Sequence, residues 1–295
     1  MKLTFFQNDV NFGDQLNLYI WPRVLPAGFL DDDDASLFLG IGSILFDTYP
    51  TVAKKYVVGS GYGGYTPPPF VHDGSWKFVF VRGSETCRAL GLSTEYAVTD
   101  GAILIRQVGA LPRAEQSVGV SFMPHYTSAA LGNWELVCKD ADISFIDPRN
   151  SVEDVIAKLN SCSLLLTEAM HGAIVADALR VPWIPLRPHS ITHQMKWSDW
   201  ADSVGVELSW SSFDYSTLPE AVSLLTQRRF SPRNSIRMNR IGDITGFNSL
   251  AKRRAIRSLR EVALGRPLLS KDHILMKRFE EARGRLYRFV DTAHL

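Results

Sequence analysis

Short apolar runs alternate with polar, glycine-rich turns through the first two thirds of the chain. Runs of this kind, bounded by turn residues, are typical of strands buried in a parallel sheet. The clearest are Leu3–Phe6, Leu37–Leu39, Tyr56–Val58, Phe78–Val81, Ser117–Phe122, Ile143–Ile146 and Leu164–Leu166. Helical patterns lie between several of them, and this alternation predicts an α/β fold with doubly wound parallel sheets.

Changes in this pattern divide the 295 residues into three expected parts. Residues 1–113 and residues 114–235 each hold one series of strands, and Pro112 and Arg113 mark the boundary between them. Residues 236–295 have a helical, amphipathic pattern. We therefore expect two Rossmann-like domains followed by a helical C-terminal extension.

One strand–turn–helix–strand unit, residues 163–186, carries a histidine at its turn. The turn contains His171, a helical pattern follows over Ala173–Arg180, and Pro182 ends it before a strand over Trp183–Leu186. In parallel sheets, ligands bind where strands give way to helix N-termini, which attract anions. His171 is therefore a candidate to contact an anion and to move a proton, or alternatively a packing or capping residue.

Polar residues and glycines follow most of the predicted strands. Glycines allow close backbone approach and free N–H groups, which is how loops bind anions. These positions are Asn11, Gly13, Asp14, Gly42, Ser43, Gly59, Ser60, Gly61, Arg82, Ser84, Asp100, His125, Glu168 and His171. As a set they predict a ligand cleft between the two domains. The sequence contains no P-loop and no GxSxG motif, and the lack of a GxSxG motif disfavours a serine hydrolase.

Several of these residues have a simpler alternative role. Arg82 offers a fork of donors for phosphate or carboxylate, or forms a surface ion pair with Glu85 or Asp100. Asp14 is a candidate base or sugar ligand, or the N-cap of a helix that begins at Gln15. The sequence leaves these alternatives open.

The composition, 45% hydrophobic and 21% charged, is that of a soluble globular protein. No apolar run is long enough to span a bilayer, and the N-terminus has no signal-like core, so we expect a cytoplasmic protein. Cys87, Cys138 and Cys162 are too few and too scattered for a disulfide framework or zinc site, and each is expected to be a buried or half-buried thiol. Asp31–Asp34 has the pattern of a solvated turn, and no metal site is predicted.

Charge is unevenly distributed, although the net charge is only +1. From Arg228 to the end, Lys and Arg outnumber Asp and Glu by nearly three to one, so the rest of the chain is acidic. Such a tail favours an anionic partner: a membrane surface, nucleic acid or the acidic body of the protein itself. Few aromatic residues are interleaved for base stacking, so we expect no nucleic acid.

Five short segments are informative in combination, because of their residues and the order in which they follow one another. They are residues 11–17 (NFGDQLN), 40–43 (GIGS), 81–84 (VRGS), 98–100 (VTD) and 168–176 (EAMHGAIVA). Together they resemble the polysaccharide pyruvyl transferase family over residues 3–187, and most closely its short bacterial members of the succinoglycan type. Family members often have an arginine where this chain has Ala169, so Arg82, Arg180 or Arg187 supplies that charge or the donor site differs.

The resemblance implies a GT-B-like arrangement of the two domains. It also implies transfer of pyruvate from phosphoenolpyruvate, as donor substrate without a cofactor, onto two hydroxyls of a sugar in an exopolysaccharide repeat unit. The product is a cyclic ketal, phosphate is released, and the acceptor is expected to be lipid-linked. The basic C-terminal helices would then contact the inner membrane peripherally. The alternatives are a nucleotide-sugar glycosyltransferase or epimerase of the same architecture, and a non-catalytic carbohydrate- or anion-binding protein.

With this family context, residues receive expected roles, with the donor side in residues 114–235 and the acceptor side in residues 1–113. The expected catalytic residues are His171, Glu168 and Asp14. The expected donor-binding residues are Arg82, Ser84, Gly42, Ser43, Gly59, Ser60, Gly61 and Gly172. The expected acceptor-binding residues are Asn11, Asp100, His125, Tyr126, His189 and His193.

Overall fold

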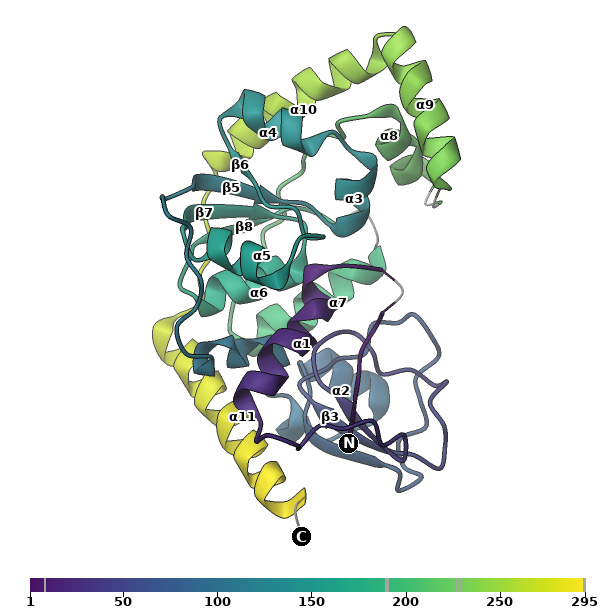
Figure 1. The fold of residues 1–295 in the computed structure, drawn as a ribbon, viewed down its shortest axis with the longest axis vertical. Helices are drawn as coiled ribbons and strands as arrows, with labels where there is room; N and C mark the ends of the chain where they lie inside the picture. The colour runs from purple at the N-terminus through teal and green to yellow at the C-terminus, as the bar shows by residue number, and fades with distance from the viewer. Residues whose placement is uncertain (8, 189–190, 227, 229, 294–295) are drawn as a thin grey trace.

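The protein contains two four-stranded parallel sheets surrounded by helices (Figure 1). The computed structural model describes residues 1–295 except 8, 189–190, 227, 229 and 294–295, and the side chains of 191–193 are also outside it. The first sheet has the order β1 (Lys2–Thr4), β2 (Ser36–Leu39), β3 (Lys54–Val58), β4 (Trp76–Phe80). The second has the order β6 (Ser144–Phe145), β5 (Gly119–Met123), β7 (Cys162–Thr167), β8 (Trp183–Pro185). The α/β class is confirmed.

The helices that surround these sheets come from all parts of the chain. They are α1 (Phe12–Val24), α2 (Ser84–Leu90), α3 (Tyr126–Leu131), α4 (Trp134–Ala141), α5 (Val152–Leu159), α6 (Met170–Ala178), α7 (Ile191–Ser203) and α8 (Leu218–Thr226). Two short 3-10 helices, η1 (Thr94–Tyr96) and η2 (Gly101–Gln107), follow α2. The C-terminal helices are α9 (Pro232–Ile244), α10 (Phe247–Ala263) and α11 (Asp272–Ala293). None of the described helices is long and apolar enough to cross a membrane.

The first sheet differs from a doubly wound sheet in its strand order. Its strands lie in consecutive order from β1 to β4, whereas in a doubly wound sheet the order of the strands reverses near an early strand. Residues 40–53 and 59–75 connect its last three strands as loops without helices, so the chain steps to the adjacent position each time. In the second sheet the strand order does reverse, because β5 pairs with β6 on one side and with β7 on the other. The GT-B-like arrangement stays a prediction.

A single large apolar core joins the two sheets. Helix α1 contributes Leu16 and Ile20 to it and packs against η2 on one side and α5 and α6 on the other. Helix α11 packs back against β4 and η2, while α10 packs against α4 and β7 (Figure 1). The C-terminal helices therefore cover both sheets. The proposed domain boundary at residue 113 stays a prediction.

Helix α6 begins earlier than its sequence pattern indicates. The pattern predicts residues 173–180, but the helix starts at Met170, which places His171 in its first turn. Thr167 explains the early start: its Oγ1 accepts from the Ala169 N–H at 3.0 Å and donates to the carbonyl of Met123 at 3.0 Å. The chain therefore turns from strand to helix within two residues.

The smaller expectations for cysteines and acids are confirmed. Cys87, Cys138 and Cys162 are buried free thiols, and burial raises their pKa values to about 11, 12 and 11. Residues 31–34 lie exposed at the surface. Among the described residues, no cluster of three His, Cys, Asp or Glu side chains is placed to hold a metal ion.

Candidate active site

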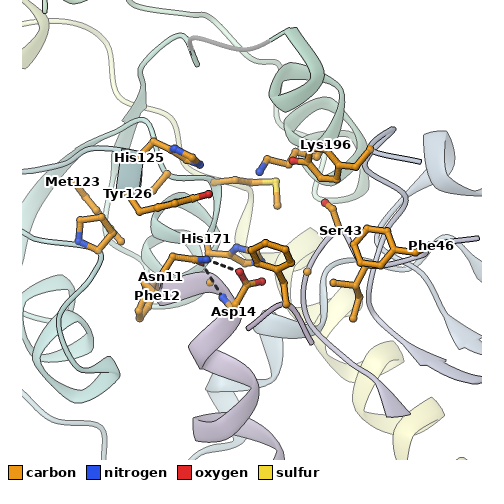
Figure 2. Close-up of a pocket in the computed structure, with 18 residues that line it drawn as sticks. Asn11, Phe12, Asp14, Ser43, Phe46, Met123, His125, Tyr126, His171 and Lys196 are labelled. Carbon is orange, nitrogen blue, oxygen red and sulfur yellow. Dashed lines mark hydrogen bonds between the residues drawn. The ribbon is translucent and has the colours of Figure 1, made fainter. Parts of the chain in front are cut away.

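A cavity of about 380 Å³ lies where the two sheets, α1, α6 and α7 meet (Figure 2). Seven of the residues to which the sequence gave a catalytic or binding role line it: Asn11, Asp14, Gly42, Ser43, His125, Tyr126 and His171. They come from the carboxyl ends of strands in both sheets, as the topology of parallel strands predicts. The other described lining residues are Phe6, Phe12, Gly13, Ile44, Phe46, Tyr65, Met123, Pro148, Ala169, Met170 and Lys196.

His171 faces a carboxylate from the other half of the molecule. Its Nε2 lies 3.7 Å from Oδ2 of Asp100, and each of these two buried atoms has no hydrogen-bond partner. Asp100 is fully buried, and its other oxygen accepts from the Ala102 N–H at 2.9 Å. Gly13 makes room for the imidazole, because a Cβ at this position would lie 2.1 Å from His171 Nδ1. The ring is therefore held between α1 and Asp100 with one nitrogen uncommitted.

Asn11 and Asp14 cap the N-terminus of α1 at the cavity wall. The cap is Asn11, not Asp14, and the helix begins at Phe12. Asn11 Oδ1 accepts from the Asp14 N–H at 3.1 Å, and the Asn11 amide donates to the Asp14 carboxylate (Figure 2). Burial raises the pKa of Asp14, while the Asn11 hydrogen bond and the charges of His171 and Lys196 act in the opposite direction. Asp14 is thus a carboxylate made more basic by burial.

Lys196 enters the cavity from α7 and was not singled out in the sequence. Figure 2 shows its nitrogen pointing into the cavity, with His125 and Tyr126 opposite. The described lining residues contain one lysine and no arginine. The pKa of Lys196 is lowered to about 8, mainly by burial and also by the charge of Arg82, whereas the carboxylates of Asp14, Asp100 and Glu168 act in the opposite direction. A lysine on a mostly polar helix gives no sequence signal, because nothing local shows which strand end α7 will cover.

The turn after β5 places His125 and Tyr126 on the far wall. His125 caps α3, with its Nδ1 2.7 Å from the Thr127 hydroxyl, and the Tyr126 hydroxyl donates to Asp9 at 3.1 Å. Glu168 lies behind this wall and does not line the cavity; its Oε2 accepts from the His125 N–H at 2.9 Å. The structure therefore places Glu168 where it positions the His125 turn.

Arg82 lies beneath the cavity and is fully buried. Its Nε donates to Asp199 of α7 at 3.0 Å, Nη1 donates to the Ser43 hydroxyl at 2.7 Å, and Nη2 donates to the Tyr62 carbonyl at 2.9 Å. Its partner is neither Glu85 nor Asp100, the two alternatives that the sequence suggested. The guanidinium joins the Ser43 loop to α7, so it fixes two walls of the cavity from behind.

The remaining expected donor residues support the cavity without lining it. Gly59 has φ +92° and packs directly on Gly101, and the Ser60 hydroxyl donates to the Leu39 carbonyl. Gly61 packs on the Arg82 guanidinium. The Ser84 hydroxyl donates to Asp202 of α7, and Gly172 lets α6 approach Met123 and Thr167 closely. His189 lies outside the described residues, as does the side chain of His193.

Comparison with known proteins shows the family of this chain. A family model described as polysaccharide pyruvyl transferase matches residues 8–190, and the chain belongs to this family. It is an enzyme, a polysaccharide pyruvyltransferase. The succinoglycan biosynthesis protein ExoV of Rhizobium meliloti (strain 1021) is 33% identical over 297 residues, which cover 92% of this chain and 93% of ExoV.

Proposed function

We propose that this enzyme transfers pyruvate from phosphoenolpyruvate to two hydroxyls of one sugar. The observation that carries the proposal is one cavity, walled by both sheets, that is lined by a histidine, a carboxylate made more basic by burial and a lysine. The N-terminus of α6 also faces this cavity through Met170 and His171 and favours an anion such as the donor carboxylate.

The proposed reaction balances as follows. The methylene carbon of the donor takes a proton, one sugar oxygen bonds to the central carbon, and the second oxygen bonds there as the C–O bond to phosphate breaks. Of the two hydroxyl protons, one is incorporated into the new methyl group and the other leaves with phosphate. The products are a cyclic pyruvate ketal and inorganic phosphate.

His171 and Asp14 have the chemistry for the two proton transfers. His171 is the general acid toward the methylene carbon, because its ring lines the cavity and imidazole is the side chain best suited to proton transfer near neutral pH. Asp14 is the general base toward the attacking hydroxyl, since burial raises the pKa of its carboxyl group. Glu168 and Asp100 act behind them as positioning residues.

We propose that the acceptor is a sugar of an exopolysaccharide repeat unit; the relative ExoV is named a succinoglycan biosynthesis protein. Aromatic side chains at the cavity, among them Phe6, Phe46, Tyr65 and Tyr126, offer faces on which a sugar ring stacks. Asn11 and His125 add polar groups beside them.

Phosphate release and product mass test this function directly. Purified protein with phosphoenolpyruvate and host-derived oligosaccharide is expected to release one phosphate per ketal formed, seen as a matching mass increase of the sugar. Calorimetric binding of uridine or guanosine diphosphate sugars without binding of phosphoenolpyruvate would instead support a glycosyltransferase or epimerase. Binding of donor and sugar without phosphate release would support a non-catalytic protein.

We also propose that the acceptor is lipid-linked and that the enzyme works peripherally at the cytoplasmic face of the inner membrane. The outer side of α9 supports this. Ile236, Ile241 and Ile244 are 57%, 46% and 86% exposed there. The helical repeat places exposed Arg233, Arg237 and Arg240 on the same side. Exposed isoleucines among arginines are typical of a helix that lies on an anionic lipid surface.

Vesicle flotation tests the lipid contact. The protein is expected to float with phosphatidylglycerol vesicles at low salt, and serine at all three isoleucines should release most of it. Glutamine at Arg283 and Arg288, which removes two positive charges from α11, is the control and should leave flotation unchanged. Equal binding to neutral vesicles, or no effect of the isoleucine changes, would contradict the contact through α9.

A further inference from the structure

Lys196 is a cation without a protein partner in the described part of the structure. Its ammonium has no hydrogen bond or ion pair there, and its half-buried side chain lines the cavity. Arg82, in contrast, has all three guanidinium nitrogens engaged. Buried polar groups are normally satisfied, so an ammonium left open toward a cavity points to a ligand that satisfies it.

The fold holds this lysine rigidly. Asp199, one helical turn further along α7, accepts from Arg82 Nε at 3.0 Å and from the Thr86 N–H and hydroxyl at 3.0 and 2.6 Å. Trp197 and Trp200 anchor the same helix in the core around Trp183. The ammonium is therefore directed into the cavity by a helix with little freedom to move.

We propose that Lys196 binds the phosphate group of the donor, with the Ser43 hydroxyl beside it. Ser43 lines the cavity, and Figure 2 shows it on the same side as Lys196. The Arg82 Nη1–H bond to Ser43 Oγ leaves the hydroxyl hydrogen of Ser43 free to donate to an anion. This assignment rests on the proposed donor, phosphoenolpyruvate, and supplies the positive charge that Ala169 does not.

The charges around Lys196 suit a side chain that becomes fully protonated when an anion binds beside it. The titratable groups near it are Asp14 and His171, which line the cavity with it, and Asp100, Glu168 and Arg82, which lie behind the cavity walls. Burial and Arg82 favour the neutral amine, and a bound phosphate dianion adds negative charge that favours the ammonium. Donor binding above neutral pH should therefore be accompanied by uptake of a proton.

The first test compares Lys196→Met with Lys196→Arg in phosphate-release kinetics and in binding of inorganic phosphate. Methionine should raise KM for phosphoenolpyruvate about ten- to a hundredfold and should weaken inhibition by inorganic phosphate by a similar factor. Arginine keeps the positive charge and should restore most of each property. Lys252→Met, which removes the ion pair between Lys252 of α10 and Asp140 of α4, is the control and should change neither. Unchanged phosphate affinity in Lys196→Met would overturn the proposal.

The second test separates Lys196 from the proposed function and from a purely structural role. Calorimetry of inorganic phosphate at pH 8.5 in buffers of different ionisation enthalpy should show proton uptake in the unaltered enzyme and none in Lys196→Arg.

Thermal melting tests a purely structural role. Lys196→Met should melt at or above the temperature of the unaltered protein at pH 7, because the folded state disfavours the ammonium. This gain should vanish as pH rises from about 8 towards 10.5. Phosphate binding that depends on Lys196, in an enzyme that releases no phosphate from phosphoenolpyruvate, would overturn the donor but support the phosphate site. A lower melting temperature with intact phosphate binding would assign Lys196 a structural role only.

Discussion

Replacing His171 with glutamine is expected to lower the rate of pyruvyl transfer by about 10²- to 10⁴-fold, the usual contribution of general acid–base catalysis. The imidazole Nε2 makes no hydrogen bond in the fold, and the side chain is 15% exposed, so its loss removes little packing. The melting temperature should therefore stay near that of the unaltered protein while turnover falls. Phosphate release at saturating phosphoenolpyruvate is the measurement, with circular dichroism as the check on folding.

A second variant tests the position of the ring without removing it. Gly13→Ala adds a Cβ that would lie 2.1 Å from His171 Nδ1, so the imidazole must move away from Asp100. We expect turnover to fall here too, whereas Gly109→Ala, whose Cβ would meet nothing within 4 Å, should leave it unchanged. Normal turnover in a well-folded His171→Gln protein would exclude His171 as the general acid.

Removing Asp199 is expected to destabilise the protein by about 3–5 kcal/mol, the largest effect on stability that we predict. Arg82 and Asp199 are 0% and 1% exposed at their side chains, so Asp199→Ala leaves an uncompensated charge in the core. It also leaves the Thr86 N–H and hydroxyl without their acceptor. The free energy of unfolding in urea at pH 7 measures the effect. Glu85→Ala, which removes an exposed ion pair with Arg88, should cost less than about 1 kcal/mol.

A double variant shows whether the stability lost in Asp199→Ala comes from the unpaired charge of Arg82. Combining Arg82→Met with Asp199→Leu removes both charges and should recover much of the lost stability, since well-packed apolar residues often replace a buried ion pair at little cost. Its activity should remain low, because Ser43 and α7 lose their common anchor. A loss below about 1 kcal/mol in Asp199→Ala would show that the pair contributes little to holding α7.

The local pattern of apolar and polar residues sufficed to predict most of the strands and part of the candidate site. The apolar runs beginning at residues 37, 56 and 164 correspond to β2, β3 and β7, because a buried parallel strand must be apolar on both faces. The carboxyl ends of parallel strands lie at one edge, so Asn11, His125 and His171 were expected to come together, and all three line the cavity. The start of α6 was missed by three residues, because Thr167 forms its turn through the carbonyl of Met123 on a neighbouring strand.

By itself, the sequence determined the α/β class, the strand ends that surround the site and the family to which the chain belongs. The tertiary structure alone decided which polar groups at those ends face the cavity. It placed Arg82 under the cavity floor against Asp199, 117 residues away in sequence, and brought Lys196 in from a helix that no strand-end pattern includes. The physical reason is range: strand and helix periodicity arises within a few residues, whereas charge pairing and cavity exposure depend on how distant helices pack.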